Sequence, residues 1–205
     1  MNNHRIDNEK PSYPKDESPK STLKEIYEWV DSAVLSVVVI ILLFTFVFRI
    51  VGIRGESMEN TLFNGNRVVI SNLFYTPKNG DIVVISRNYL NVKGDTSRDD
   101  SPIIKRVIAT EGQTLTIDSA TGSVYVDGVK LNEDYIKDGA VTTWEDGTTD
   151  AKSVTVPEDC IFVMGDNRTD SMDSRFQSIG MVDTRYVLGK AFLRIYPFND
   201  FGGLY

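Results

Sequence analysis

An uncharged apolar run, "AVLSVVVIILLFTFVF" from Ala33 to Phe48, constrains this 205-residue chain more than any other feature of its sequence. With Trp29 before it and apolar residues as far as Ile53 after it, the run reaches the roughly 20 residues that a helix needs to cross a bilayer core. A buried helix of a soluble core is the alternative, but such a helix usually carries its apolar residues on one stripe. Here they occupy every face, so the sequence predicts a transmembrane helix over residues 25–52.

The helix is predicted to be a permanent anchor. A cleavable signal peptide has its apolar segment close to the N-terminus and a small-x-small site after it, and this sequence has neither. Residues 1–24 open with "MNNHRIDNEKPSYPKDESPK", which is polar, charged and proline-bearing, and they are predicted to form a disordered cytoplasmic tail.

Basic residues predict the orientation of the anchor. Only Arg49 and Arg54 follow the apolar run closely, whereas five basic residues precede it: Arg5, Lys10, Lys15, Lys20 and Lys24. Because basic residues favour the cytoplasmic side, we expect a single-pass protein of the cell membrane, with residues 53–205 forming an extracytoplasmic domain.

Composition excludes several classes of partner and site. The net charge of −7 and the pI near 4.8 argue against nucleic acid, which needs clustered lysine and arginine. Cys160 is the single cysteine and His4 the single histidine, so neither an intramolecular disulfide nor a zinc site of Cys and His can form. No cofactor is expected, and the oligomeric state is left open.

The region after the anchor is predicted to be mostly β. Short runs rich in Val, Ile, Tyr and Phe are bounded by Gly, Asn, Asp or Pro, which is typical of strands. Asp127-Gly128 between two such runs is a strong hairpin signal. The predicted strands fall within residues 66–75, 80–86, 105–110, 113–118, 122–128, 152–156, 160–166 and 188–198.

Ser57, in "RGESMENTL" just past the anchor, is a candidate nucleophile that would need a base. A Ser-His-Asp triad is out of reach, because His4 lies in the tail and the membrane segment separates it from Ser57. A carboxylate or a lysine remains possible. A lysine acts as a base only when neutral, and desolvation is what lowers its pKa.

Lys105 in "SPIIKRVIAT" fits that requirement, since apolar residues surround it in a predicted strand. Strand alternation puts Lys105, Val107 and Ala109 on one face and Arg106 and Ile108 on the other. A solvated lysine at a strand start is the plainer interpretation of this stretch alone.

The polar stretch "MGDNRTDSMDSRF", Met164 to Phe176, directly follows an apolar strand. Its Asp and Asn side chains could form a polar surface loop or bind calcium, although the spacing does not match an EF-hand. Alternatively, Asp173 and Arg175 are close enough to pair, and the hydroxyls of Ser171 and Ser174 could orient an amine.

These stretches, in this order behind an N-terminal anchor, resemble bacterial type I signal peptidases of the Gram-positive type, which are membrane-anchored Ser-Lys proteases. The family pattern G-x-S-M-x-P-T-L is similar to residues 55–62, and the other family segments resemble residues 65–85, "KRVIATEGQTL" and "GDNRTDSMDSR". The resemblance covers nearly the whole chain after the anchor.

The resemblance implies that Ser57 is the nucleophile and Lys105 the general base. It further implies that Ser171 orients the lysine amine, that Asp173 and Arg175 form a supporting pair, and that Asp166 belongs to the same shell.

The implied fold is a β body shared with self-cleaving repressor proteases, with a smaller β insertion at about residues 118–157. The implied function is an endopeptidase that removes N-terminal signal peptides from exported preproteins at the outer membrane surface.

Several positions depart from the family pattern. Asn60 stands where proline is usual, Gly55 where some members carry a serine of the oxyanion hole, and Asp170 where asparagine is common. Residues 109–111 replace a more usual Gly-Leu-Pro. None of these changes removes an implied catalytic group.

Two other functions fit the same outline. A non-catalytic or specialised relative could assist assembly of surface proteins or pili, but we expect such a relative to lack Ser57 or Lys105. A self-cleaving regulator on the same fold would need a DNA-binding domain, and the predicted anchor argues against it.

Overall fold

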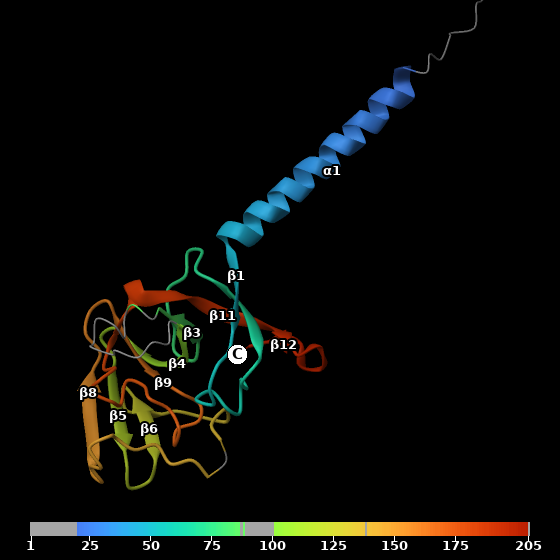
Figure 1. The fold of residues 1–205 in the computed structure, drawn as a ribbon. Helices are drawn as coiled ribbons and strands as arrows, with labels where there is room; N and C mark the ends of the chain where they lie inside the picture. Colours follow the sequence, from blue (N-terminus) through green and yellow to red (C-terminus); the bar gives the residue numbers. More distant parts are fainter. Residues whose placement is uncertain (1–19, 87, 89–100, 138, 205) are drawn as a thin grey trace, which may run out of the picture. The chain divides into compact units, whose positions relative to one another are not determined.

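The computed structural model describes residues 20–86, 88, 101–137 and 139–204, and it divides into two units, Met1–Leu42 and Leu43–Tyr205 (Figure 1). Most of the predicted tail, residues 1–19, lies outside the described residues. Helix α1 covers Lys20–Phe46, and its apolar part, Thr22–Thr45, has a mean hydropathy of 2.0. By length and composition α1 could therefore cross a membrane, as the sequence indicated.

The bounds of α1 differ from the predicted 25–52. The helix begins earlier, because residues 20–24 are mostly good helix formers, and it ends at Phe46. Strand β1, Phe48–Gly52, follows and pairs antiparallel with β2, Arg67–Ser71. A short apolar run such as residues 48–52 has no periodicity that distinguishes helix from strand. Here the pairing with β2 makes it a strand.

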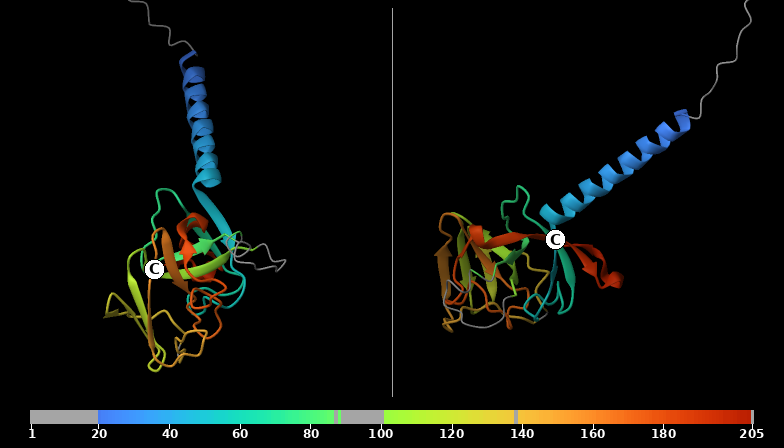
Figure 2. Two further views of the ribbon diagram at one scale, coloured as in Figure 1. Left: turned by 90° about the vertical axis from the view of Figure 1, so that its left-hand side faces the viewer. Right: turned by 45° about the horizontal axis from the view of Figure 1, so that its top comes forward.

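The larger sheet has eight antiparallel strands in the order β1-β2-β11-β3-β4-β9-β10, with β12 paired to β11. Figure 2 shows the strands of the body from two further directions. The single-turn 3-10 helices η1, Thr184–Tyr186, and η2, Phe198–Asp200, flank β11. The remaining strands are β3 (Ile82–Ile85), β4 (Ile103–Thr110), β9 (Cys160–Met164), β10 (Val182–Asp183), β11 (Val187–Tyr196) and β12 (Gly202–Gly203).

The smaller sheet has the order β7-β6-β5-β8, all antiparallel. It comprises β5 (Thr114–Asp118), β6 (Ser123–Val126), β7 (Val129–Lys130) and β8 (Ala151–Thr155), and thus starts slightly before the insertion predicted at 118–157. Asp127 and Gly128 have φ values of 52° and 79° between β6 and β7. Both values are positive, as a two-residue type I′ turn requires, so the predicted hairpin is confirmed.

Strand β4 contributes to all three hydrophobic clusters of the body. Ile104 packs with the cluster of Ile53 and Met58, Val107 with that of β3 and β9, and Ile108 with the cluster that joins the two sheets. The register with β9 shifts between Val107 and Ala109. Ala109 therefore packs beside Ile108, and the prediction that it shares a face with Val107 is wrong.

Candidate active site

Ser57 and Lys105 meet although 48 residues separate them: Lys105 Nζ lies 2.7 Å from Ser57 Oγ, within hydrogen-bonding distance. Ser57 lies in the loop between β1 and β2, and Met58 beside it is buried in the core. Lys105, in β4, is only 4% exposed and pairs with Val83 of β3. Because Met58 and the residues around Lys105 are buried in the core, the packing holds the Ser57 hydroxyl against the Lys105 amine.

Burial lowers the pKa of Lys105 from 10.5 to about 8. Removal of water is the largest cause, because the charged ammonium loses more solvation than the neutral amine. The charge of Arg175 lowers the pKa further, whereas the carboxylates of Asp173 and Asp166 raise it. A substantial fraction of the amine is consequently neutral near pH 8.

The loop after β9 carries a buried ion pair. Arg175 Nε and Nη2 donate to the two carboxylate oxygens of Asp173, each at 2.8 Å. Asp173 also accepts from the backbone N–H of Gly165 at 2.9 Å, and Arg175 Nη2 lies 3.3 Å from the carbonyl oxygen of Ser171. These contacts close the loop on itself, and they confirm the pairing of Asp173 with Arg175 that the sequence suggested.

A second buried ion pair joins Asp166 to Arg106, the residue after Lys105. Arg106 Nε and Nη2 donate to the two oxygens of Asp166 at 2.8 and 2.7 Å, and Nη1 donates to the carbonyl of Gly80 at 2.8 Å. The hydroxyl of Thr61 also donates to Asp166. Asp166 thus connects β4 to the loop that carries Ser57.

Both pairs bear on the calcium interpretation of this loop. Asp166 and Asp173 supply two of the hard oxygen ligands that it requires, and each has both carboxylate oxygens engaged by an arginine. The geometry therefore favours an ion-paired loop over a cation site.

Ser171 and Gly165 complete the surroundings of Ser57. The buried Ser171 Oγ makes no hydrogen bond within the described part of the chain. A methyl group built on Gly165 would lie 2.3 Å from both Ser171 Oγ and the Ser57 carbonyl oxygen, so both atoms face the same point. The Asn167 N–H donates to the Ser57 carbonyl at 3.0 Å, which joins the two loops directly.

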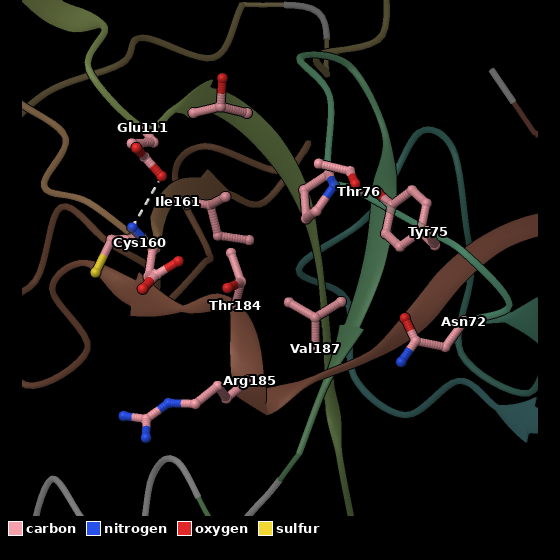
Figure 3. A pocket seen from close by; sticks show the side chains of 12 residues that line it. Asn72, Tyr75, Thr76, Glu111, Cys160, Ile161, Thr184, Arg185 and Val187 are labelled. Carbon is pink, nitrogen blue, oxygen red and sulfur yellow. Dashed lines mark hydrogen bonds between the residues drawn. The ribbon is translucent and has the colours of Figure 1, made fainter.

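A separate cavity of about 330 Å³ lies where β4 ends and β9 begins, away from the Ser57–Lys105 contact (Figure 3). Its lining includes Tyr75, Glu111, Cys160, Arg185 and Val187, and none of the predicted site residues. Glu111 accepts a hydrogen bond from the backbone N–H of Asp159 at its rim, drawn as a dashed line in Figure 3. This cavity is distinct from the Ser57–Lys105 site.

A family model described as signal peptidase, peptidase S26, matches residues 26–196, which is most of the chain. The chain belongs to this family. Its membership indicates a serine peptidase, and the resemblance inferred from the motifs is confirmed.

The chain is similar to two curated Bacillus proteins over most of its length and to one solved structure over part of it. A signal peptidase I of Bacillus licheniformis is 35% identical over 88% of this chain and 95% of its own, and the signal peptidase I S of Bacillus subtilis is 33% identical over 88% and 94%. The crystal structure of a signal peptidase I from Enterococcus faecalis V583 is 28% identical and covers 57% of this chain and 97% of its own, with a TM-score of 0.41.

Sequence reasoning missed two members of the site. Strand alternation predicts that Arg106 faces away from Lys105, but it does not predict the pairing of Arg106 with Asp166. No sequence motif points to Tyr135, whose ring centre lies 4.0 Å from Arg106 Cζ. A signal for Arg106 did exist, because a charged residue inside an apolar strand needs a buried partner.

We expect Gly165→Ala to destabilise the protein by about 1–3 kcal/mol, since the added methyl group must displace both Ser171 and the backbone carbonyl of Ser57. Urea unfolding followed by circular dichroism measures this change. Gly202→Ala is the matched control, because its methyl group meets nothing within 4 Å and its backbone is not left-handed. Equal stability of the two variants would contradict the close packing at Gly165.

Proposed function

We propose that this protein removes signal peptides from exported preproteins, with Ser57 as the nucleophile and neutral Lys105 as the general base. The observation that carries the proposal is the 2.7 Å contact between Lys105 Nζ and Ser57 Oγ in a site where the amine is buried. The similarity to proteins named signal peptidase I supports the choice of substrate.

The proposed reaction has two steps that use the same amine. Lys105 takes the proton of Ser57 while Oγ attacks the scissile carbonyl carbon, and the resulting ammonium gives that proton to the leaving amine nitrogen. In the second step Lys105 takes a proton from a water molecule whose oxygen attacks the carbonyl carbon of the acyl ester. The resulting ammonium then gives that proton to Ser57 Oγ, and the carboxylic acid product leaves. Protons and bonds balance over the cycle.

The developing oxyanion needs a donor. The backbone N–H of Ser57 makes no hydrogen bond to another described residue, so it is available to a substrate oxygen. Gly55 leaves no side-chain hydroxyl at the position where some relatives carry a serine.

Ser171 is proposed to orient the amine of Lys105. Its buried hydroxyl has no partner among the described residues, and leaving such a group unsatisfied is costly. If the neutral amine donates one N–H to Ser171 Oγ, that bond satisfies the hydroxyl oxygen and leaves the nitrogen lone pair directed toward Ser57. Asp173 and Arg175 support this arrangement because Arg175 also contacts the Ser171 carbonyl.

The proposed location is the outer surface of the cell membrane, with α1 as the anchor and the tail in the cytoplasm. The chain from Phe46 to Ser57 spans at most about 40 Å when fully extended. A preprotein cleavage site lies just beyond an apolar segment lodged in the bilayer, so tethering both partners to one membrane raises their effective concentration.

We expect Ser57→Ala and Lys105→Ala each to abolish cleavage of a preprotein, with the β body still folded. Because the two groups act as a unit, the double variant should be little worse than either single variant. Gel-based cleavage of a preprotein by detergent-solubilised enzyme, with N-terminal sequencing of the product, measures this. Normal activity of Lys105→Ala would refute the mechanism.

We expect kcat/KM to rise about tenfold per pH unit below pH 8 and to level off above it, since only the neutral amine accepts a proton. The midpoint follows from the lowered pKa of Lys105, about 8. Lys105→Arg should be inactive across the range, because guanidinium remains charged. Initial rates at constant ionic strength test this, and a profile flat from pH 6 to 10 is incompatible with it.

The proposed orientation predicts that protease added to intact protoplasts degrades the β body and spares a tag at the N-terminus. The reason is the excess of basic residues before α1. Immunoblots against the tag and against the body measure the outcome, with lysed protoplasts as the control. Protection of the body together with loss of the tag is the contrary result.

A further inference from the structure

The segment Glu133–Lys137, "EDYIK", lies in the connection between β7 and β8 of the smaller sheet and touches the loop that carries Ser57. Asn60 Nδ2 donates to the carbonyl of Ile136 at 3.1 Å, and Lys137 Nζ lies 3.5 Å from Glu59 Oε2. Glu59 and Asn60 follow Ser57 closely, so the connection between β7 and β8 contacts the nucleophile loop itself.

On its other side this segment covers two buried arginines. The ring centre of Tyr135 lies 4.0 Å from Arg106 Cζ and 5.9 Å from Arg168 Cζ, which are cation–π distances. Glu133 forms an ion pair with Arg168 and accepts a hydrogen bond from the Tyr135 hydroxyl at 3.2 Å. The ring therefore lies against the guanidinium group of Arg106 and near that of Arg168.

The contacts of Tyr135 extend to the nucleophile loop. Arg106 binds both oxygens of Asp166, and Asp166 in turn accepts from the hydroxyl of Thr61. The carbonyl of Asp166 also accepts from the Lys137 N–H at 3.4 Å. The segment therefore contacts Glu59 and Asn60 directly, and it reaches Thr61 through Arg106 and Asp166.

We propose that the 133–137 segment is a positioning element for the Ser57–Lys105 pair, with Tyr135 holding Arg106 against Asp166 and Ile136 tethering Asn60. This inference rests on the proposed function of that pair. A proline restricts its backbone by itself. Asn60, where proline is usual, instead uses its amide to fix the loop to the connection between β7 and β8.

A positioning role differs measurably from a contribution to folding alone. A variant that is only less stable lowers the melting temperature and leaves kcat per folded molecule unchanged. A variant that misplaces Oγ or Nζ lowers kcat with little change in KM, because the geometry matters most in the reacting state.

The test uses full-length protein in detergent with two readouts: preprotein cleavage, and the rate at which a penem-type acylating probe labels Ser57. We expect Tyr135→Leu to lower kcat and the labelling rate about tenfold with KM within about twofold, and Asn60→Asp to lower both rates about fivefold. Asn60→Asp keeps the size of the side chain but turns the donor into a carboxylate that faces a carbonyl.

Three matched controls accompany these variants. Tyr135→Phe keeps the ring over Arg106 and should stay near wild type. Asp134→Asn alters an exposed neighbour whose carboxylate accepts from Asn132 at 2.7 Å, and should have no effect. Asn60→Pro lacks the amide, as Asn60→Asp does, but restricts the backbone directly, so it should retain wild-type kcat.

Wild-type kcat and labelling rates in folded Tyr135→Leu and Asn60→Asp would overturn the positioning role. If Tyr135→Leu fails to fold, Asn60→Asp decides, because Asn60 is exposed and its replacement leaves the core intact. A wild-type enzyme that neither cleaves nor becomes labelled refutes the proposed function and the inference with it. An active wild type with unaffected variants refutes the inference alone.

Discussion

The burial of one amine, Lys105 Nζ, against Ser57 Oγ is the constraint on which the rest of the site depends. Removing water favours the neutral amine, but a buried carboxylate nearby favours the ammonium again. Two carboxylates, Asp166 and Asp173, lie close enough to act in that direction. Each is paired through both oxygens with an arginine, which offsets much of its charge. Arg175, whose charge lowers the pKa of Lys105, therefore helps to preserve the effect of burial on the lysine. Both arginines also hold the loops together.

Strand β4 shows how one segment meets both requirements. Lys105 reaches Ser57, whereas Arg106 reaches Asp166, and consecutive side chains of a strand point to opposite faces. The strand is buried along most of its length and belongs to three clusters, so neither side chain can move without disturbing the core. The Lys105 amine and the Arg106–Asp166 ion pair are consequently placed by the same hydrophobic packing.

Much of this arrangement could be predicted from the sequence, because it depends on local patterns. Every predicted run contains a strand, and the Asp127-Gly128 hairpin has the expected turn. The motif order brought Ser57, Lys105 and the loop after β9 into one hypothesis, and the structure brings those residues together. The predictions that were wrong concern features that depend on tertiary contacts. Strand β1 has the composition of the apolar helix and is a strand because it pairs with β2. The register shift after Val107 has no local sequence signal.

The connection between β7 and β8 illustrates the limit most clearly. "NEDYIK" has neither a strand period nor a catalytic motif, so its sequence predicts only a polar connection. In the structure this segment packs against the guanidinium group of Arg106 and against the Ser57 loop at Asn60. A rigid loop can be obtained from the backbone or from a tether to another element. With a tether, the geometry of Ser57 depends on residues about eighty positions away in the sequence. A contact between residues so far apart has no local sequence signal and is seen only in the folded structure.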